Sequence, residues 1–437
     1  MSDVVVTIDK LSYGGAGFGR VEGKACFVPF AAPGDRARIR VTADKRSYIE
    51  GELIELLEPS LFRVVPPCPV FGICGGCNWQ HLAYPAQLAE KEEIIAELLW
   101  RIARVEREHI LPIVPAPEPF AYRSRIQLKV SYIAGAVHIG FFRTKSHCIV
   151  DIPVTCAIVQ PEINKIIAEL CQLLNNSPEP DKISQVDVSS GDDGKTIVII
   201  HYKGSSPAQL SAYLLEHRDT LADGMFIQSG SKPSLIKVFG IENLSYRIAD
   251  NELPGISAAR LSFSKGGFSQ VNYRQNRHLI ELVRSWAELT GKEKVLDLYC
   301  GNGNFSIPLA GCAKRVVGLE GYEPSIIDAK RNGELNNLTN AVFHRADAAL
   351  ELKKRVAAGE DYDVVVLDPP RSGAAEVVNQ IHALKPKSIL YVSCDPATLA
   401  RDIGILKKHN FEVVKCRPLD MFPQTYHIES VTLLRPA

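Results

Sequence analysis

The stretch that decides the fold of this chain is KVLDLYCGNGNFSIPLA, residues 294–310. It reads as a short apolar strand, then a turn that contains Gly301 and Gly303, then the start of an apolar helix. A glycine turn that follows a strand and opens a helix lets the backbone come close to a bound ligand. Two glycines alone are a weak signal, but this order of strand, turn and helix predicts the first unit of a parallel α/β sheet.

Acidic residues follow the next two predicted strands. Residues 315–319 form an apolar strand that ends on Glu320, and residues 341–344 form a third strand that Asp347 follows. A carboxylate after the second strand accepts hydrogen bonds from the two hydroxyls of a ribose, and we expect Asp347 near the edge of an adenine. A dinucleotide site would need a third glycine near Ser306. S-adenosylmethionine has a ribose without a phosphate and fits better; an NAD-type fold is the alternative.

The fourth predicted strand, residues 363–367, ends on the motif DPPR, residues 368–371. Methyltransferases that act on exocyclic amines have an aromatic residue after the prolines, where this chain has Arg371, and cytosine carbon-5 enzymes have a cysteine in this motif. This chain has its thiol one strand later, at Cys394 in SCDP, residues 393–396. A thiol at the carboxyl end of a strand predicts a nucleophile, and an inert buried cysteine is the alternative.

The pattern of the chain changes along its length. From residue 256 to 437, strands and helices alternate, which predicts an α/β domain with a Rossmann-like parallel sheet. Residues 60–255 mix alternating strands with few helices, which predicts a central α+β domain. Within it, apolar residues at helical spacing predict a helix over 84–104, a candidate to pack on the C-terminal domain, and a proline-rich linker follows at 112–119.

Residues 1–59 read as short strands between glycine-rich turns, which predicts an OB-like β-barrel. The turn GAGFGR, residues 15–20, followed by a strand, PF at 29–30, PGD at 33–35 and a basic strand, resembles the TRAM domain. That module accompanies RNA-modifying enzymes, and a barrel without any ligand is the alternative. OB barrels bind nucleic acid through exposed aromatic and cationic side chains, for which the candidates are Phe18, Arg20, Arg38, Arg40, Lys45 and Arg46.

The composition sets limits on the class of protein. The chain has 437 residues, 46% hydrophobic and 23% charged, with zero formal net charge and 11 cysteines, which is typical of a globular protein of about three domains. It has no apolar run of about 20 residues that would span a membrane and no secretory signal at its start. We therefore expect a cytoplasmic protein with reduced or metal-bound cysteines. The zero net charge argues mildly against a nucleic-acid partner, although a local basic face remains compatible with one.

These motifs together resemble the RNA (uracil-5-)-methyltransferase family over essentially the whole chain, and in particular its iron–sulfur-containing 23S rRNA branch with an N-terminal TRAM domain. The resemblance implies Cys394 as the nucleophile and Glu429 as the base. The matching stretches are FSQVN at 268–272, residues 297–304, EG at 320–321, DPPR at 368–371, SCDP at 393–396 and HIE at 427–429. The residues implied to bind S-adenosylmethionine are Gln270, Tyr299, Asn304, Glu320, Asp347 and Asp368.

The implied chemistry explains why such a site needs a thiol and a base. Carbon 5 of uracil accepts a methyl group only after a thiolate has added to carbon 6. A free cysteine with a pKa of ~8.5 is mostly protonated at neutral pH, so a cation such as Arg371 or Arg401 is expected to lower it. A base must then remove the carbon-5 proton so that the enzyme can leave by elimination. The target uridine must leave its stack, which favours a single-stranded loop and a flipped base.

Three cysteines, Cys68, Cys74 and Cys77, are closely spaced in the segment after the barrel. By ligand type, four thiolates suit zinc or an iron–sulfur cluster, and a redox dithiol is a further alternative. The resemblance implies a [4Fe-4S] cluster with Cys156 as the fourth ligand, and Cys148 is the rival for that place. The cluster would have a structural or RNA-binding role, because methyl transfer requires no electron.

The sequence therefore predicts a monomeric, S-adenosylmethionine-dependent enzyme that methylates carbon 5 of a uridine in 23S rRNA. A tRNA uridine-5-methyltransferase, a non-catalytic RNA-binding or ribosome-assembly protein, and a redox iron–sulfur protein are the alternatives.

Overall fold

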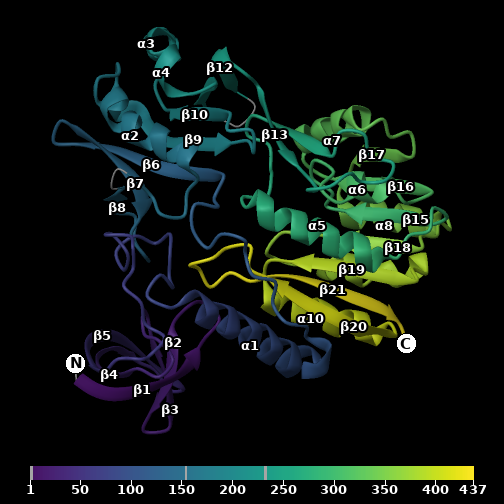
Figure 1. Cartoon of the computed structure of the whole chain (residues 1–437), viewed down its shortest axis with the longest axis horizontal. Coiled ribbons are helices and arrows are strands. Elements are labelled where there is room, and N and C mark those ends of the chain that lie inside the picture. Colours follow the sequence, from purple (N-terminus) through teal and green to yellow (C-terminus); the bar gives the residue numbers. More distant parts are fainter. Residues whose placement is uncertain (1–2, 153–154, 231–233) are drawn as a thin grey trace.

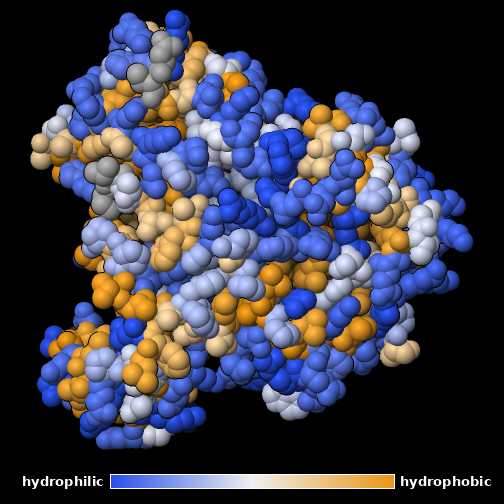
Figure 2. Space-filling view, in the orientation of Figure 1, coloured by the Kyte–Doolittle hydropathy of each residue, from blue (hydrophilic) through white to orange (hydrophobic). Residues whose placement is uncertain are grey.

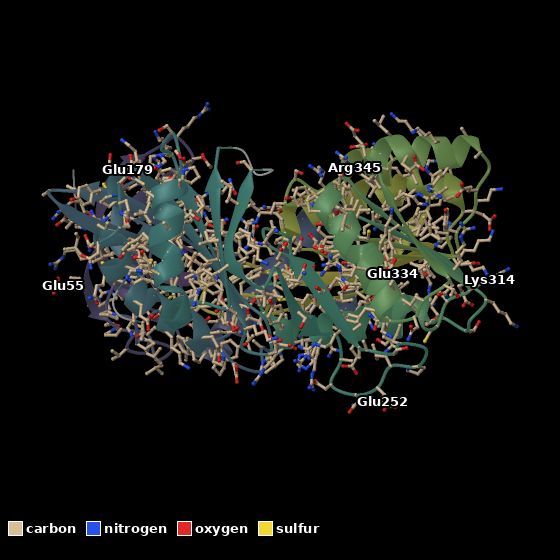
Figure 3. All side chains as sticks on the ribbon, turned by 90° about the horizontal axis from the view of Figure 1, so that it is seen from above. Glu55, Glu179, Glu252, Lys314, Glu334 and Arg345 are labelled. Carbon is tan, nitrogen blue, oxygen red and sulfur yellow. The ribbon has the colours of Figure 1, made fainter. Side chains whose placement is uncertain are left out.

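The computed structural model describes residues 3–152, 155–230 and 234–437. Figure 1 shows three parts: a purple barrel at the N-terminus, a blue-to-teal sheet above it, and a green-to-yellow α/β sheet beside both. The barrel forms a lobe of its own in the space-filling view, with a notch between it and the central part (Figure 2). Seen from above, the charged side chains of Glu55 and Lys314 point outward at opposite ends of the molecule (Figure 3). No helix in these ranges is long and apolar enough to cross a membrane.

The N-terminal part is a closed barrel, as the sequence predicts. Its strands follow the order β1-β2-β3-β5-β4. Side chains alternate between the barrel core and solvent: in β1, Val6 and Ile8 face the core and Thr7 between them is exposed. Glycine is required at Gly19, where a Cβ atom would lie 2.2 Å from the carbonyl oxygen of Thr7. The strands are β1 (Asp3–Leu11), β2 (Gly17–Val21), β3 (Lys24–Val28), β4 (Arg36–Asp44) and β5 (Tyr48–Glu58).

A long helix, α1 (Tyr84–Ala103), connects the barrel to the rest of the molecule. Its apolar face, which includes Ile95 and Leu99, lies in one hydrophobic core with the C-terminal sheet, and the helix packs against α10 (Pro396–Lys408). Its buried ammonium, at Lys91, pairs with the buried carboxylate of Asp420 at 2.6 Å. The helix thereby fixes the segment that follows β20 (Phe411–Leu419).

The central part is a seven-stranded sheet with the order β12-β11-β10-β9-β6-β7-β8. Its strands are antiparallel except for the parallel pair β10 and β11, and α2 and α3 pack on it in one hydrophobic core. The strands are β6 (Arg125–Ile133), β7 (Ala136–Phe142), β8 (Ile149–Asp151), β9 (Ile183–Ser190), β10 (Thr196–Tyr202), β11 (Gly224–Ser229) and β12 (Leu235–Gly240). The helices are α2 (Pro161–Asn175), α3 (Ala208–Glu216) and α4 (Arg218–Leu221), with the 3-10 turn η2 (Pro180–Lys182). A further 3-10 turn, η1 (Arg107–His109), follows α1 and contacts β20 of the C-terminal sheet.

The C-terminal sheet has the order β17-β16-β15-β18-β19-β21-β20, in which β15 to β19 are parallel and β21 is antiparallel to both of its neighbours. The predicted alternation of strands and helices is therefore confirmed. The strand order reverses between β15 and β18, and in sheets of this kind ligands bind at the carboxyl ends beside that reversal. The strands are β15 (Lys294–Leu298), β16 (Arg315–Glu320), β17 (Ala341–Arg345), β18 (Val364–Leu367), β19 (Ser388–Ser393), β20 and β21 (Glu429–Pro436).

Helices cover both faces of this sheet and bury a separate core on each. One face packs against α5, α6 and α7, and the other against α1, α8, α9 and α10. A two-stranded ribbon, β13 (Asn243–Arg247) with β14 (Arg260–Ser264), leads into α5 and contacts α7. The helices are α5 (Tyr273–Ala287), α6 (Ser306–Ala310), α7 (Glu323–Leu335), α8 (Ala348–Ala357) and α9 (Ala375–Val378), with the 3-10 turn η3 (Ile381–Leu384).

Candidate active site

The glycine turn after β15 lies at the carboxyl edge of the C-terminal sheet. Tyr299 and Gly301 adopt left-handed backbone conformations, with φ of 65° and 55°. A Cβ atom added to Gly301 would meet nothing within 4 Å, whereas one at Gly303 would lie 2.9 Å from the Ile307 side chain. The turn is therefore packed against the sheet and helix at Gly303 and open at Gly301, where a ligand has room.

Three acids surround this open turn. Glu320, at the end of β16, accepts hydrogen bonds from the backbone N–H of Gly301 at 3.2 Å and of Tyr322 at 2.7 Å. Asp297 accepts one from the Ser306 hydroxyl at 2.5 Å, but its buried Oδ1 has no partner among the described residues. The pKa values of Asp297 and Asp368 are both raised to about 7, first by burial and in addition by the nearby acids. Such a concentration of buried acids favours a cationic ligand.

The predicted nucleophile and base lie side by side. Strand β19 pairs with β21 so that its last residue, Ser393, stands opposite Ser430, and Cys394 and Glu429 are the residues just beyond this pair. Directly opposite residues in an antiparallel pair have Cβ atoms about 4.5–5.5 Å apart. The register of two strands therefore places a thiol and a carboxyl group at the same edge, next to Asp368.

The electrostatics of the thiol differ from the expectation of an activated cysteine. The pKa of Cys394 is raised to about 12, first by burial and then by the charges of Glu429 and Asp368, while Arg371 lowers it. Arg401, the other predicted cation, instead binds Asp402 and donates to the Ser372 carbonyl at 2.9 Å. Arg371 is thus the cation that acts on the thiol, but it does not offset burial and the acids.

The carboxyl group of Glu429 is buried at the start of β21. Its pKa is raised well above the usual range, first by burial and then by Asp368, and Arg371 acts in the opposite direction. A carboxyl group with a raised pKa binds a proton more tightly, which is the property required of a base. Arg371 in turn lies 3.4 Å from Nε2 of His427. Burial first, and then Arg371, lower the pKa of His427 to about 4.

The other residues predicted to bind S-adenosylmethionine have different surroundings. Tyr299 has its pKa raised to about 12, by burial first and then by the charge of Asp347, so the two side chains are close. One oxygen of Asp347 caps α8 by accepting the N–H of Leu350 at 2.9 Å. Gln270 is buried in the loop before α5.

Asn304 serves the internal structure of the turn. Its side-chain amide exchanges two hydrogen bonds with the amide of Asn276, at 2.8 and 3.0 Å, and accepts a third from the Tyr246 hydroxyl at 3.1 Å. These bonds fasten the glycine turn to α5 and β13. Asn304 thereby holds the turn in place, and a direct contact with a ligand stays a prediction.

Four of the cysteines come together in space. Cys68, Cys74, Cys77 and Cys156 line one pocket of about 250 Å³, whereas Cys148 is exposed between β7 and β8 and lies outside it. Burial first, and the neighbouring thiols in addition, raise the pKa of Cys77 to about 12 and that of Cys156 to about 11. Neighbouring thiolates would repel one another, so a positively charged metal group would stabilise them.

The arrangement of these thiols bears on the kind of metal group. Among the described residues, no three His, Cys, Asp or Glu side chains are grouped so that they could hold a single metal ion. A tetrahedral zinc requires its ligands to meet at one point. In a four-iron cluster, each thiolate binds a different iron, so the sulfurs stand further apart around a larger volume. The described residues therefore show no metal centre, and a four-iron cluster on these thiols stays a prediction.

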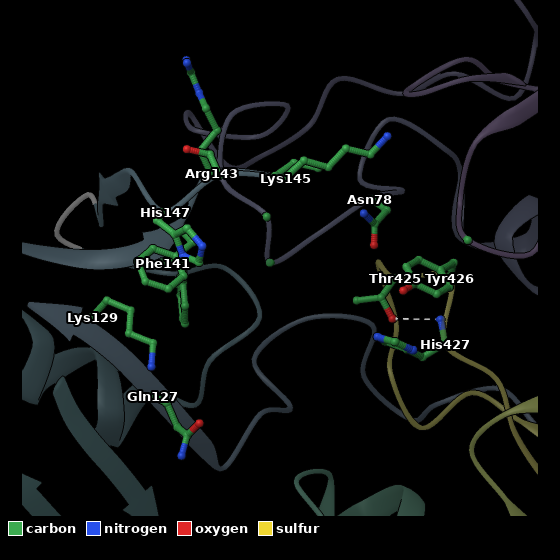
Figure 4. A pocket seen from close by; sticks show the side chains of 16 residues that line it. Asn78, Gln127, Lys129, Phe141, Arg143, Lys145, His147, Thr425, Tyr426 and His427 are labelled. Atoms are coloured by element: carbon green, nitrogen blue, oxygen red, sulfur yellow. Dashed lines mark hydrogen bonds between the residues drawn. The ribbon is translucent and has the colours of Figure 1, made fainter. Parts of the chain in front are cut away.

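A larger pocket of about 740 Å³ lies between the barrel, the central sheet and the loop before Glu429. Its lining residue Tyr426 packs on Tyr13, which binds Asp395, the residue next to Cys394. In Figure 4, Lys129 and Phe141 of the central part face Tyr426 and His427 across this pocket. Among the described residues that line it there are cations and aromatic rings but no acid. The lining cations are Lys129, Arg143 and Lys145, and the imidazoles of His147 and His427 also line the pocket.

Sequence reasoning missed two contributors to this site. Asp297 was not predicted as a site residue, although an acid directly before a glycine turn is a pattern visible in the sequence. Tyr13, in the barrel, donates a hydrogen bond of 2.6 Å to Asp395 beside the nucleophile, and the two residues are 382 positions apart in the sequence. No local pattern indicates such a contact.

Comparison with known proteins agrees with this geometry. Residues 83–436 match the family model described as tRNA (uracil-5-)-methyltransferase, and residues 2–54 match the TRAM domain. The 23S rRNA (uracil(1939)-C(5))-methyltransferase RlmD of Vibrio cholerae is 33% identical over 98% of this chain and 94% of its own length. An uncharacterized RNA methyltransferase of Thermosynechococcus vestitus is 35% identical over 99% of this chain and 97% of its own length.

A solved structure with the same organisation is the tRNA (uracil-54, C5)-methyltransferase of Pyrococcus abyssi in complex with S-adenosyl-L-homocysteine. It has a TM-score of 0.74 and 27% identity, and the match covers 99% of this chain and 100% of that chain. With the family model extending over most of the chain and relatives matching nearly all of it, the chain belongs to the tRNA (uracil-5-)-methyltransferase family, as a member with an N-terminal TRAM domain.

Proposed function

We propose that this protein methylates carbon 5 of a uridine in 23S rRNA, with Cys394 as the nucleophile and Glu429 as the base. The observation that carries the proposal is the pairing of Ser393 with Ser430 where β19 ends and β21 begins, beside which the charges of Glu429, Asp368 and Arg371 act on the Cys394 thiol. The relatives named as 23S rRNA enzymes match nearly the whole chain, which favours rRNA as the substrate. One copy of the chain carries both side chains, so the proposed site needs no partner subunit, and we propose a monomer that acts in the cytoplasm.

The residues around the glycine turn fit S-adenosylmethionine. Its sulfonium and ammonium groups are cationic, and they suit the acids at this edge, of which Asp297 is buried and Glu320 and Asp368 are half-buried. The open space over Gly301 and the unpartnered Oδ1 of Asp297 leave room and an acceptor for such a ligand. When bound, S-adenosylmethionine supplies the methyl group that carbon 5 accepts.

The two catalytic side chains act in sequence. The Cys394 thiol loses its proton to water, its sulfur bonds to carbon 6, and the electron pair of the C5–C6 double bond moves into an enolate, which makes carbon 5 of the ring nucleophilic. After the methyl group has been accepted, Glu429 removes the proton of carbon 5, the sulfur–carbon bond breaks, and the thiolate is released. The high pKa of Cys394 in the free protein means that the thiol is largely protonated until substrate binds.

The basic pocket beside Cys394 supports RNA as the substrate. Backbone phosphates bind Lys129, Arg143 and Lys145, while unstacked bases stack on aromatic rings such as Phe141 and Tyr426. The formal net charge of the whole chain is zero, but the cations that line this pocket form a local basic face. The proximity of this pocket to Cys394 suits a uridine flipped out of a single-stranded loop.

We propose further that Cys68, Cys74, Cys77 and Cys156 hold a [4Fe-4S] cluster. The support is the single pocket that these four thiols line and the exclusion of Cys148 from it. The cluster would join the loop after the barrel to the central sheet, where the N–H of Gly75 already binds the carbonyl of Phe142 at 3.0 Å.

A tRNA substrate is the second candidate, because the solved relative from Pyrococcus abyssi is named as a tRNA enzyme. To decide between them, the protein is incubated with S-adenosylmethionine and transcripts of 23S rRNA or of tRNA, and nucleosides are analysed by mass spectrometry. We expect 5-methyluridine in 23S rRNA and none in tRNA. Methylation of tRNA alone would reassign the substrate, and methylation of neither would refute the proposal.

A further inference from the structure

The turn between the first two strands of the barrel reaches the nucleophile. The phenolic hydroxyl of Tyr13 donates a hydrogen bond of 2.6 Å to Oδ2 of Asp395, the residue that follows Cys394. The barrel is at the opposite end of the sequence from the catalytic strand. An N-terminal module therefore makes a direct polar contact next to the thiol.

The two oxygens of Asp395 have separate partners. Oδ1 accepts the backbone N–H groups of Ala397 at 3.1 Å and Thr398 at 2.8 Å, which begins α10, and Oδ2 accepts the Tyr13 hydroxyl. A capping carboxylate satisfies donors that the first turn of a helix leaves unpaired. The rotation of this carboxylate is thus fixed from two sides, and the backbone of Cys394 lies between the end of β19 and the capped helix.

The barrel turn itself is held firmly. The indole N–H of Trp79 donates to the carbonyl of Gly15 at 3.0 Å, and the N–H of Leu11 donates to Glu90 of α1 at 2.7 Å. The ring of Tyr13 meets that of Tyr426 edge to face, with centroids 5.9 Å apart. Tyr13 is therefore presented to Asp395 by a fixed turn, and the contact does not depend on a mobile side chain finding its partner.

We propose that Tyr13 is a positioning residue for the nucleophile, and that the barrel completes the active site through it. The inference rests on the proposed function, because it assumes that Cys394 is the nucleophile. The adjacent Gly14 lines the basic pocket. RNA bound there touches the same turn that holds Asp395, which links substrate binding to the geometry of the thiol.

The charges around Cys394 give the direction of the effect. Glu429 from β21, Asp368 from the segment after β18, and Asp395 before α10 all disfavour the thiolate, and only Arg371 favours it. The pKa of Tyr13 is raised far above its ordinary value, by burial first and then by Asp395, so the phenol remains a donor. Its hydrogen bond withdraws part of the negative charge of Asp395 from the thiol.

The test compares Tyr13→Phe, which removes the hydroxyl but keeps the ring, with Tyr48→Phe in β5 of the same barrel. The first readout is the rate at which iodoacetamide alkylates Cys394 in the free full-length protein, followed by mass spectrometry of the Cys394 peptide, with exposed Cys148 as an internal reference. The second is single-turnover methyl transfer. We expect Tyr13→Phe to slow both about tenfold, with the KM for RNA within about twofold of wild type, and Tyr48→Phe to slow neither.

A second substitution tests the route of the effect. Asp395→Asn keeps an oxygen that can cap α10 but removes the charge that Tyr13 shares. In the Asp395→Asn background, Tyr13→Phe should change the alkylation rate by less than about twofold, because interacting residues are not additive. Additive effects would overturn the inference.

Other results would also overturn it. One is an unchanged rate of Cys394 alkylation in Tyr13→Phe. Another is a higher KM for RNA in Tyr13→Phe with unchanged alkylation and turnover, which would make Tyr13 an RNA contact only. Alkylation requires neither RNA nor methyl donor, so a wild-type protein that methylates no RNA would refute the proposed function separately.

Discussion

Cys394 and Glu429 lie close together because β19 ends and the antiparallel strand β21 begins at the same edge of the sheet. Their separation along the sequence is large, and only the antiparallel return of β21 brings them together. Arg371 acts on both, since it lowers the pKa of the thiol and of the carboxyl group. At the scale of residues, the site is thus a pair of groups whose proton affinities one guanidinium adjusts.

The role of Glu429 as the base is tested by Glu429→Gln. The amide has nearly the shape of the carboxyl group but accepts no proton, so methyl transfer should proceed and elimination should stop. We expect a methylated covalent complex of protein and RNA to accumulate, detected by denaturing gel electrophoresis and mass spectrometry. Normal turnover without such a complex would assign the base to another residue.

The pH dependence of the thiol is tested by Arg371→Gln. A positive charge stabilises the thiolate, so its removal raises the pKa of Cys394 further, and the thiolate fraction at a given pH falls. The rate of methyl transfer at neutral pH should fall roughly tenfold for each unit that the pKa rises, and the rising limb of the pH profile should move to alkaline pH. Arg401→Gln, whose guanidinium binds Asp402, is the matched control; a profile unchanged in Arg371→Gln would argue against this role.

Much of the site could be predicted from residues because its signals are local. The glycine turn, Glu320 after β16 and the thiol after β19 each lie at the end of an apolar strand, which is visible in the sequence. The raised pKa of Cys394 could not be predicted, since it depends first on burial and then on Glu429 and Asp368 from two other segments. The structural bonds of Asn304 to Asn276 and Tyr246 were equally invisible, because they join separate elements.

At the scale of elements, α1 connects the barrel to the catalytic loop. It was predicted over 84–104 from its apolar spacing and is observed as Tyr84–Ala103. A pattern of apolar residues assigns Lys91 to a solvent face, yet its ammonium is fully buried against Asp420 and donates to the carbonyl of Phe422 at 3.0 Å. Only the tertiary fold supplies the partner that allows a lysine to be buried.

Breaking this pair should destabilise the protein. Lys91→Met leaves Asp420 as an uncompensated buried charge whose Oδ2 already has no partner among the described residues, with an expected cost of about 3–5 kcal/mol. The fluorescence of Trp79, 5.6 Å from the ammonium, reports unfolding in denaturant. Lys10→Met, which breaks an exposed pair with Glu97, should cost no more than about 1 kcal/mol. Equal losses in both variants would refute the role of burial.

The proposed cluster on the loop of Cys68, Cys74 and Cys77 is tested by the colour of the purified protein. Each Cys→Ser substitution at these positions or at Cys156 should remove the brown chromophore of anaerobically purified protein and reduce its solubility, because thiolate ligation contributes folding free energy. Cys148→Ser should keep both. Stoichiometric zinc without iron, or colour lost from Cys148→Ser and kept in Cys156→Ser, would contradict the assignment.

At the scale of the whole molecule, three parts meet around one basic pocket. The barrel and the alternating C-terminal sheet were predictable because their strands have regular spacing and turn signals. Their arrangement was not, since it depends on contacts such as Tyr13 with Asp395 and Lys91 with Asp420 between segments hundreds of residues apart. The pocket exists only through that arrangement, and so do its cations.

The most direct test of covalent catalysis uses RNA that contains 5-fluorouridine at the target position. Fluorine replaces the proton that Glu429 would remove, so elimination stops and the thiol remains bonded to carbon 6. Wild-type protein, S-adenosylmethionine and this RNA should form a stable adduct whose cross-linked peptide contains Cys394, and Cys394→Ala should form none while binding S-adenosylmethionine normally. The absence of an adduct in wild type, an adduct on another residue, or full methylation by Cys394→Ala would contradict the account.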